Sequence, residues 1–362
     1  SDPGFGHFPS TKMITLRNGL ALGSGAPVRV NCNIGCNTEK EYASELQKIE
    51  AIKVSGSIPD MMMDLSLIRM HKPLYLVAQE ELNVETGTVL SYIPFSKANG
   101  LQWEICKDYL YELCENGISF ITIHFTASRE LFELAKKIRK IPSTSRGGAM
   151  CLYDSINNDR DNIFMQHIDE IAEISIQSGV AISLGSTFRP ANIFDACDEV
   201  HIKETKAQLD VCHYLHRKGV KVIVENIGHV GLDKLEHHSD LLKQFDAAIM
   251  PLGPLATDDA IDMDHVNNAI GAAFAAYWGC AHVINAVTRQ EHTGVQISAD
   301  DTIEAICSAR LAAHAVNVAK GIELDKDKII VEQRIHKHSC LVSDGFCTRC
   351  IDCCPLKILN ND

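Results

Sequence analysis

The sequence predicts an α/β fold, a (βα)8 barrel of the TIM type followed by a helical C-terminal region and a cysteine-rich tail. Between residues 28 and 287, short β-rich runs alternate with amphipathic helical stretches, the pattern of parallel strands with helices outside. The regular repetition favours a closed barrel over an open sheet. After residue 302 the pattern becomes helical, and cysteines crowd the end of the chain.

The strand candidates number nine, one more than the barrel needs: residues 28–31, 61–65, 87–90, 120–124, 143–146, 181–185, 221–226, 247–252 and 282–287. Five helical stretches are long enough to connect parallel strands: residues 103–116, 129–140, 166–178, 203–218 and 267–278. A further helix is expected at 303–319. We expect four parts, an N-terminal arm (1–27), the barrel (28–300), a helical region (301–330) and a cysteine-rich tail (331–362).

The composition of the chain narrows the range of possible functions. The 362 residues, 46% hydrophobic and 22% charged, suffice for a full-sized core. A formal net charge of −13 argues against a nucleic-acid surface, which needs clustered Lys and Arg. No apolar run is long enough for a membrane span and the start lacks signal-peptide character, so we expect a cytoplasmic protein. The 14 cysteines suit a reducing compartment, metal chemistry and an anaerobe.

In such barrels the chemistry takes place where strands end, so polar residues after strands are candidates. They are Asn31, Asn33, Asp64, Tyr92, His124, Ser145, Arg146, Arg189, Glu225 and His229.

Cysteine spacing in the tail indicates a metal. Cys347 and Cys350 have the Cys-x-x-Cys spacing that lets two thiolates reach one metal, and Cys353 and Cys354 follow closely. Three thiolates would leave one iron of a four-iron cluster open. Structural zinc, completed by Cys340 or His338, explains the spacing equally well.

Residues 144–148, Thr-Ser-Arg-Gly-Gly, are typical of a phosphate site. The glycines admit backbone N–H groups close to an anion, while Ser145 and Arg146 add a hydroxyl and a guanidinium. A tight turn is the alternative. Arg189, after another strand, has a carboxylate or phosphate as its expected partner, with a structural ion pair as the alternative.

Two loop histidines are candidate metal ligands. His229 and His292, with Glu225 and Glu291 nearby in the sequence, follow strand candidates and suit a divalent ion. Merely solvated histidines are the alternative. We interpret the adjacent His237 and His238 as a surface pair.

Taken in order, these motifs resemble the phosphomethylpyrimidine synthase (thiamin pyrimidine synthase) family from about residue 28 to 320. The segments that carry the resemblance are residues 31–35, 63–66, 87–89, 123–124, 145–148, 183–185, 189–190, 225, 228–230, 252–255, 264–265, 269–273, 291–292 and 312–315.

The resemblance implies a radical S-adenosylmethionine (SAM) lyase of the carbon–carbon type, with a [4Fe-4S] cluster, SAM and Zn²⁺ or another divalent metal as cofactors. It implies 5-aminoimidazole ribotide, a small phosphorylated ribotide, as substrate in thiamin biosynthesis. It also implies a homodimer in which each tail serves the partner's active site, and a reductant such as flavodoxin or ferredoxin. No nucleic acid and no membrane are expected as partners.

The resemblance also implies residue roles. The expected catalytic residues are Glu225, Arg189 and His124. The expected ligands of zinc or another divalent ion are His229 and His292. The expected cluster ligands are Cys347, Cys350 and Cys354. An iron–sulfur cluster is therefore the expected metal group of the tail. Substrate binding falls to Asn33, Met63, Tyr92, His124, Ser145, Arg146, Gly147, Gly148, Arg189 and Glu225.

This chain departs from the family pattern within the pocket. Ser186 replaces an Asp expected to contact substrate, Asn226 and Ile227 replace Gly-Pro, and Met250 falls at or beside an expected Tyr. The expected third cluster ligand falls at Pro355, so Cys354 or Cys353 must substitute, and Cys354 preserves the spacing more nearly.

These departures favour a diverged paralogue with altered substrate handling, such as 5-hydroxybenzimidazole synthase, which makes a cobamide lower-ligand base anaerobically. Two readings from other classes stay open. A metal-dependent barrel hydrolase would use His229 and His292 to activate water but leaves the cysteine tail unexplained. An inactive partner subunit is suggested by Ser186.

Overall fold

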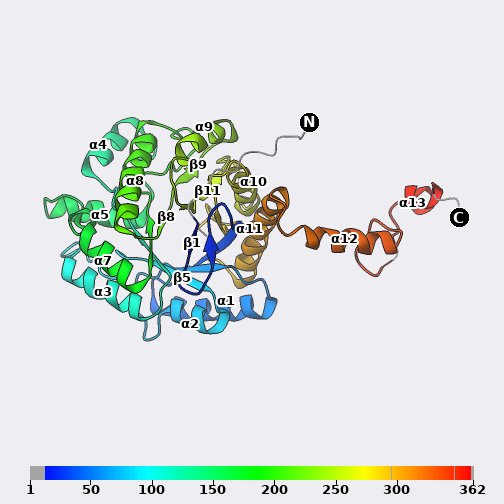
Figure 1. Ribbon diagram of the computed structural model, residues 1–362, viewed down its shortest axis with the longest axis horizontal. Helices are drawn as coiled ribbons and strands as arrows, with labels where there is room; N and C mark the ends of the chain where they lie inside the picture. The colour runs from blue at the N-terminus through cyan, green and yellow to red at the C-terminus, as the bar shows by residue number, and fades with distance from the viewer. Residues whose placement is uncertain (1–12, 295, 346, 360–362) are drawn as a thin grey trace. The chain divides into compact units, whose positions relative to one another are not determined.

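An eight-stranded parallel barrel forms the centre of the computed structural model, which describes residues 13–294, 296–345 and 347–359 (Figure 1). Its strand order is β10-β8-β7-β6-β5-β4-β3-β12. The strand bounds are β3 Arg29–Ile34, β4 Met61–Asp64, β5 Glu85–Val89, β6 Phe120–Ile123, β7 Ala181–Leu184, β8 Val222–Val224, β10 Ala248–Ile249 and β12 Val283–Asn285. The α/β barrel predicted from the sequence is confirmed.

A side chain helps to close the seam between β10 and β12. The backbone N–H of His282 donates to the carbonyl oxygen of Ile249 over 2.7 Å. In return, the N–H of Ile249 donates to Nδ1 of the buried His282 ring over 3.0 Å. The imidazole thus takes the place of the carbonyl that a regular strand would offer, and the barrel is nearly closed.

A hairpin shares the hydrophobic interior of the barrel. It consists of β1 (Ile14–Thr15) paired antiparallel with β2 (Ala21–Leu22). Its apolar side chains belong to one buried cluster with Met61 and Phe120 of the barrel strands. Glu85, at the start of β5, accepts hydrogen bonds from two backbone N–H groups of the hairpin turn. The hairpin therefore lies at the end of the barrel where β5 begins, and the opposite end carries the candidate site. Residues 1–12 of the expected N-terminal arm lie outside the described residues.

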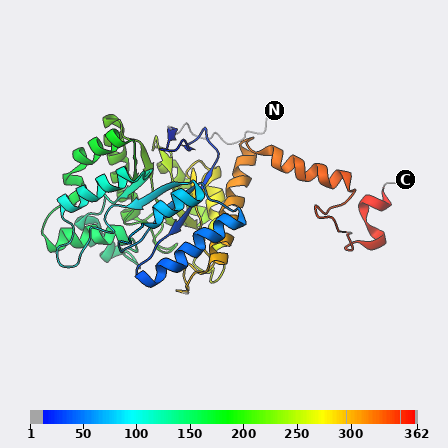
Figure 2. The ribbon, with the colours of Figure 1, turned by 90° about the horizontal axis from the view of Figure 1, so that it is seen from below.

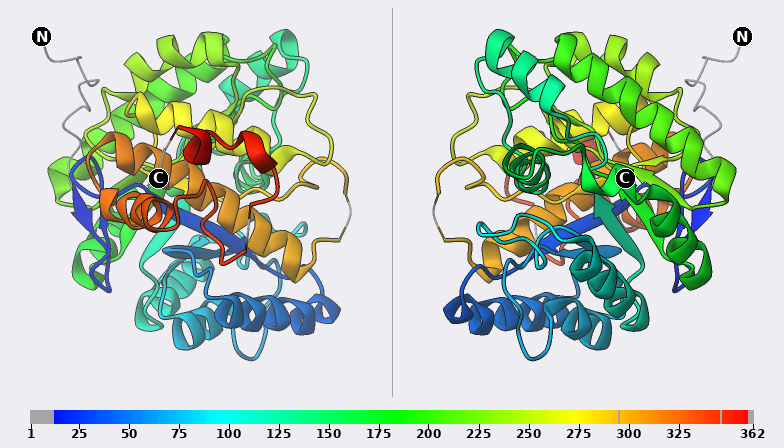
Figure 3. Two further views of the ribbon diagram at one scale, coloured as in Figure 1. Left: turned by 90° about the vertical axis from the view of Figure 1, so that its right-hand side faces the viewer. Right: turned by 90° about the vertical axis from the view of Figure 1, so that its left-hand side faces the viewer.

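Helices surround the strands (Figure 3). Apolar residues of the helices and of the outward strand faces form a continuous buried cluster. Helices α1 and α2 lie side by side along one flank (Figure 2). The bounds in this part of the chain are α1 Glu39–Ser55, α2 Leu74–Leu82, α3 Trp103–Glu115, α4 Arg129–Ile138, α5 Arg146–Asn157, α6 Ile163–Gln166, α7 Ile168–Ser178, α8 Glu199–Lys218, α9 Leu232–Leu242, α10 Asp264–Tyr277 and α11 Ala299–Ala319.

One predicted strand is wrong. Residues 143–146 do not form a strand, because Ser145 is the N-cap of α5 and its Oγ accepts the N–H of Gly148 over 3.1 Å. Without this segment, eight of the nine candidates are left for the barrel.

Two strands extend the barrel at the carboxyl ends of β8 and β10. After β8 the chain continues into β9 (Ile227–His229), and after β10 into β11 (Leu252–Leu255). These two strands pair in parallel, with Leu255 opposite His229. They carry the chain past the barrel rim and fix His229 at its mouth.

Contacts divide the chain into two compact units, Ser1–Val316 and Asn317–Asp362. The second unit holds α12 (Leu324–His336), a short 3₁₀ turn at Ile351–Cys353 and α13 (Pro355–Ile358). The four functional parts expected from the sequence stay predictions. Among the described residues, no helix combines the length and apolar character that crossing a membrane requires.

Candidate active site

A cavity opens at the carboxyl ends of the barrel strands. Its space, open solvent at the mouth included, amounts to about 600 Å³. Most of the residues predicted to bind substrate line it together. The lining residues are Asn33, Met63, Leu65, Val89, Tyr92, Thr122, His124, Ser145, Arg146, Ser186, Arg189, Glu225, Asn226, Leu252 and Asn285.

Glu225 follows β8 and is held at one oxygen. Its Oε2 accepts hydrogen bonds from Thr122 Oγ1 over 2.6 Å and from Ser183 Oγ over 2.7 Å. Burial raises the pKa of this carboxyl, and the two hydroxyls and Arg189 oppose that shift. With Oε2 fixed by neighbouring strands, Oε1 is the atom available for contact with a ligand.

His124, at the end of β6, is buried among glycines. A Cβ at Gly147 would lie 2.3 Å from its ring, and one at Gly185 would lie 2.6 Å away. Burial, with a smaller effect of Arg189, lowers the pKa of His124 to about 3, so the ring is neutral at physiological pH. Its Nε2 lies 3.2 Å from Ser145 Oγ, while Nδ1 has no hydrogen-bond partner within the described part of the chain.

The N-terminus of α5 faces the cavity. Ser145 caps it, and the guanidinium of Arg146, the first helical residue, lies 5.1 Å from the centre of the Tyr92 ring. Gly148 packs so closely that a Cβ there would lie 2.4 Å from Thr187 Cγ2. The glycines therefore bring the helix start, with its free N–H groups and positive dipole end, against the cavity wall, an arrangement suited to an anion.

Arg189 lies in the loop after β7, and a buried carboxylate organises that loop. Glu204 of α8 accepts hydrogen bonds from the N–H groups of Thr187 and Phe188 and from the hydroxyl of Ser186. Arg189 Nη1 donates to the carbonyl oxygen of Ser186 over 2.8 Å, and its Nε lacks a partner in the described residues. Glu204 was not predicted from the sequence.

Asparagines define the wall near β3. Asn31 Nδ2 donates to Asn285 Oδ1 over 2.7 Å and to Asn33 Oδ1 over 3.0 Å. Asn33 and Met63, one on each of two paired strands, are directly opposite in register. This network orients the amide of Asn33 at the edge of the cavity.

The two predicted metal-binding histidines lie together. The ring centres of His229 and His292 are 5.1 Å apart. His229 Nδ1 contacts Asp258 Oδ1 at 2.7 Å, and His292 Nδ1 contacts Asp264 Oδ2 at 2.8 Å. Each carboxylate fixes the tautomer that leaves Nε2 with its lone pair, and histidines that bind metals commonly have such a carboxylate partner. The pair thus fits a divalent ion, with further ligands from water or substrate.

The interpretation of His237 and His238 as a surface pair is half wrong. His237 is exposed, but only 2% of His238 is accessible to solvent. The ring of His238 lies against that of His201, with centres 4.2 Å apart. Burial lowers the pKa of His238 to about 4 and that of His201 well below its ordinary value, so both rings are neutral.

The tail thiols are free and lie within the second compact unit. Cys340, Cys347, Cys350 and Cys354 line one hollow together with Lys337, Arg349 and Lys357. Thiolates beside cationic side chains suit an anionic iron–sulfur cluster. Cys353 is not among the residues that line this hollow.

A family model described as the radical SAM ThiC family matches residues 9–338. The chain belongs to the radical SAM ThiC family. It is 31% identical over 311 residues to phosphomethylpyrimidine synthase of Carboxydothermus hydrogenoformans, a match that covers 83% of this chain and 72% of that relative.

A second phosphomethylpyrimidine synthase, of Thermoanaerobacter, is 32% identical over 333 residues, or 87% of this chain and 75% of the relative. Among solved structures, dihydropteroate synthase of Xanthomonas albilineans has a TM-score of 0.45 and 9% identity, over 80% of this chain and 93% of that one. Such a likeness is too weak to add to the argument. Membership in the radical SAM ThiC family implies a [4Fe-4S] cluster and SAM, which the free tail thiols fit.

Several residues of this family member's site escaped sequence reasoning. Glu204 lies four residues after Val200 and four before Gln208, all on the buried face of α8, so a charged residue at an apolar-face position was the available signal. Asp264 lies in a segment that carries the resemblance, but its contact with His292 was not predicted. Asp258 lies in a loop and gave no signal.

Proposed function

We propose that this chain is a radical SAM lyase that rearranges 5-aminoimidazole ribotide or a closely related ribonucleotide. One observation carries the proposal: the side chains that the resemblance assigns to the ribotide line a single cavity at the carboxyl ends of the barrel strands. Family membership supplies the reaction class, and the cavity supplies a place for a small anionic ligand.

The phosphate would bind at the start of α5. The hydroxyl of Ser145, the guanidinium of Arg146 and the backbone N–H groups of Arg146 and Gly147 are all near this point. Charge-assisted hydrogen bonds from Arg and a helix N-terminus both favour a phosphate dianion. A chain with a net charge of −13 needs such a local site to attract an anion.

Proton handling would fall to Glu225, with Arg189 and His124 orienting the substrate. Glu225 Oε2 is occupied by two hydroxyls, so Oε1 would give or take the proton. Its raised pKa makes the protonated form accessible nearer neutral pH than for an exposed Glu. Neutral His124 would offer a hydrogen bond without adding a charge beside Arg189.

The tail would hold the cluster through Cys347, Cys350 and Cys354. When bound, the cluster supplies the electron that splits SAM into methionine and a 5′-deoxyadenosyl radical. We propose flavodoxin or ferredoxin as the reductant and a homodimer in which each tail serves the partner's cavity. A tail that covers the barrel mouth would exclude water from reactive species.

His229 and His292 would hold one divalent ion, and we propose that it is Zn²⁺. Their carboxylate partners support this assignment, because each fixes an Nδ1–H and leaves Nε2 as donor. The ion would help to place the ligand at the mouth of the barrel.

The proposal is tested by anaerobic reconstitution with iron and sulfide, followed by incubation with SAM, reductant and 5-aminoimidazole ribotide. We expect 5′-deoxyadenosine that depends on the ribotide, and none from Cys347→Ala. A metal-dependent hydrolase or an inactive partner subunit would produce none from the parent protein.

A second product is favoured by the loop that carries Arg189. The resemblance places an acid where Ser186 lies, and here Ser186 lines the cavity with an uncharged hydroxyl that donates to Glu204. This difference favours 5-hydroxybenzimidazole or another ribotide-derived product over the thiamin pyrimidine. Mass analysis of the products distinguishes the two.

A further inference from the structure

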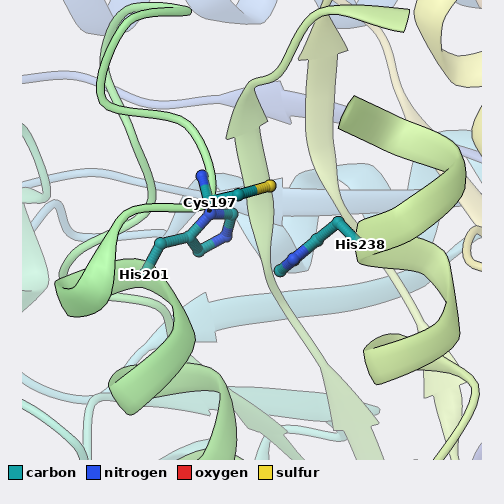
Figure 4. Close-up of side chains that lie close together, drawn as sticks. All are labelled: Cys197, His201 and His238. Atoms are coloured by element: carbon teal, nitrogen blue, oxygen red, sulfur yellow. Dashed lines mark hydrogen bonds between the residues drawn. The ribbon is translucent and has the colours of Figure 1, made fainter. Parts of the chain in front are cut away.

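We propose that Cys197, His201 and His238 form a second divalent-metal site that takes Zn²⁺, separate from the His229–His292 pair. One ligand atom from each of the three residues lies within 4.8 Å of the others. In Figure 4 the thiol of Cys197 and the ring of His238 point toward each other, with His201 beside them.

The three residues come from separate positions around β8. Cys197 lies in the loop that precedes α8, His201 in the first turn of α8, and His238 on α9. Both imidazoles are almost completely buried and the thiol is partly buried. Cys197 has a φ of 59°, a left-handed conformation that is costly for a residue other than glycine. Buried, convergent Cys and His side chains are what a structural metal site requires.

Asn226 orients the two imidazoles through one amide oxygen. Its Oδ1 faces Nε2 of His201 at 3.1 Å and Nε2 of His238 at 3.3 Å. The amide orientation is fixed, because Nδ2 donates to Thr205 Oγ1 and to Gln208 Oε1. An oxygen acceptor requires a hydrogen on each Nε2. Both rings therefore carry their lone pair on Nδ1, the tautomer that a metal needs there.

The donor set identifies the metal class. One thiolate and two neutral imidazoles suit zinc, with a water in the fourth position of a tetrahedron. Ligand atoms in such a tetrahedron are roughly 3.5 Å apart, so ligand atoms that are separated by up to 4.8 Å must approach each other by up to about 1.3 Å. Nδ1 of His201 now accepts the N–H of Cys197 over 3.2 Å, a weak contact that the metal would replace.

The site would join the loop before α8 to α9 across β8, whose following residue is Glu225. Asn226, one of the departures from the family pattern, lines the catalytic cavity and contacts both imidazoles. The metal would therefore stabilise the strand end that carries the catalytic carboxylate. Its effect on the cavity would be indirect, because the thiol and both rings belong to residues outside the cavity lining.

Zinc content of the iron-reconstituted protein tests the site, with two matched pairs of variants. His238→Gln is compared with His237→Gln, an exposed neighbour, and Cys197→Ser with Cys307→Ser, an exposed thiol. We expect His238→Gln and Cys197→Ser to hold one zinc per chain less than the parent, and the two controls to match it. Asn226→Ala should weaken zinc affinity by about 10- to 100-fold.

Equal zinc content in all four folded variants would overturn the proposal and leave a hydrogen-bonded cluster that binds no metal. If the buried variants fail to fold, the parent protein is loaded with cadmium and studied by cadmium NMR. The position of the resonance reports how many sulfur atoms coordinate the metal. A cadmium resonance typical of one sulfur ligand supports the site. Resonances typical only of sulfur-free or sulfur-rich sites contradict it.

Discussion

Ser186 donates a hydrogen bond from Oγ to Oε1 of the buried Glu204 over 2.7 Å. The resemblance places an Asp at this position, where a second carboxylate would meet Glu204. Burial already raises the pKa of Glu204. A hydroxyl is therefore compatible with the loop that carries Arg189, and a carboxylate is not.

We expect Ser186→Asp to impair turnover and to lower the free energy of unfolding by on the order of 1–3 kcal/mol at neutral pH. Two adjacent buried carboxylates cannot both be charged at low cost, so one must stay protonated. The deficit should shrink as pH falls, because protonation then removes the repulsion. Urea unfolding and product formation at several pH values measure both effects.

Adding Glu204→Gln to Ser186→Asp should recover part of the lost stability, because the amide removes one charge. Ser186→Ala serves as the control for the lost hydroxyl. A Ser186→Asp variant that makes more pyrimidine product than the parent would show that the pocket handles its ligand as the family pattern predicts, against the paralogue proposal.

Arg146→Ala should weaken ribotide binding at least about tenfold, because it removes a charge-assisted contact worth roughly 1.5–3 kcal/mol. Arg146→Lys keeps the positive charge but loses the paired N–H groups of the guanidinium, so we expect an intermediate loss of ribotide affinity. Calorimetric titration with the ribotide and with its dephosphorylated nucleoside measures the effect. The phosphate assignment fails if Arg146→Ala weakens both ligands equally.

The double variant His229→Ala, His292→Ala should lose one divalent ion per chain while keeping its iron and its fold. Asp258→Asn should lower metal affinity by about 10- to 100-fold, since it disturbs the tautomer that the carboxylate fixes. Metal analysis by mass spectrometry checks both. An unchanged metal content in the double variant would contradict the site.

Among the tail thiols, Cys354→Ala should abolish 5′-deoxyadenosine formation and Cys353→Ala should not. Cys354 lines the same hollow as Cys347 and Cys350, and Cys353 does not. Cys347→Ala and Cys350→Ala should also be inactive with the barrel folded, since their thiolates serve the cluster alone. Iron content and circular dichroism provide the readouts. The reverse result for Cys353 and Cys354 would reassign the third ligand.

Much of the barrel could be predicted because apolar runs of strand length recur between helical periods. The extra strand at 143–146 was predicted because strand length and flanking turn residues do not reveal a helix cap. The hydrogen bond from the Gly148 N–H to Ser145 Oγ decides the structure there. Helix starts with Gly in the first turn are therefore easily mistaken for turns after a strand.

Most of the site residues that were not predicted from the sequence are buried polar residues. In α9, Leu235, His238, Ser239 and Leu242 are buried at the spacing of one helix face, so the position of His238 was predictable from that periodicity. The partner of His229 was not, because Asp258 lies 29 residues away in a loop. Local patterns place a residue on a face, but the fold selects the distant group that it meets.

The most direct test of the central claim is label transfer from ribotide carrying deuterium at its ribose carbons. The anaerobically reconstituted protein, given SAM, reductant and labelled ribotide, should form 5′-deoxyadenosine that contains deuterium, because the radical abstracts its hydrogen atom from the bound ribotide. Mass spectrometry of the nucleoside reads the result. Deuterium-free 5′-deoxyadenosine at the same rate with and without ribotide, or none at all, would contradict a radical enzyme that acts on this ligand.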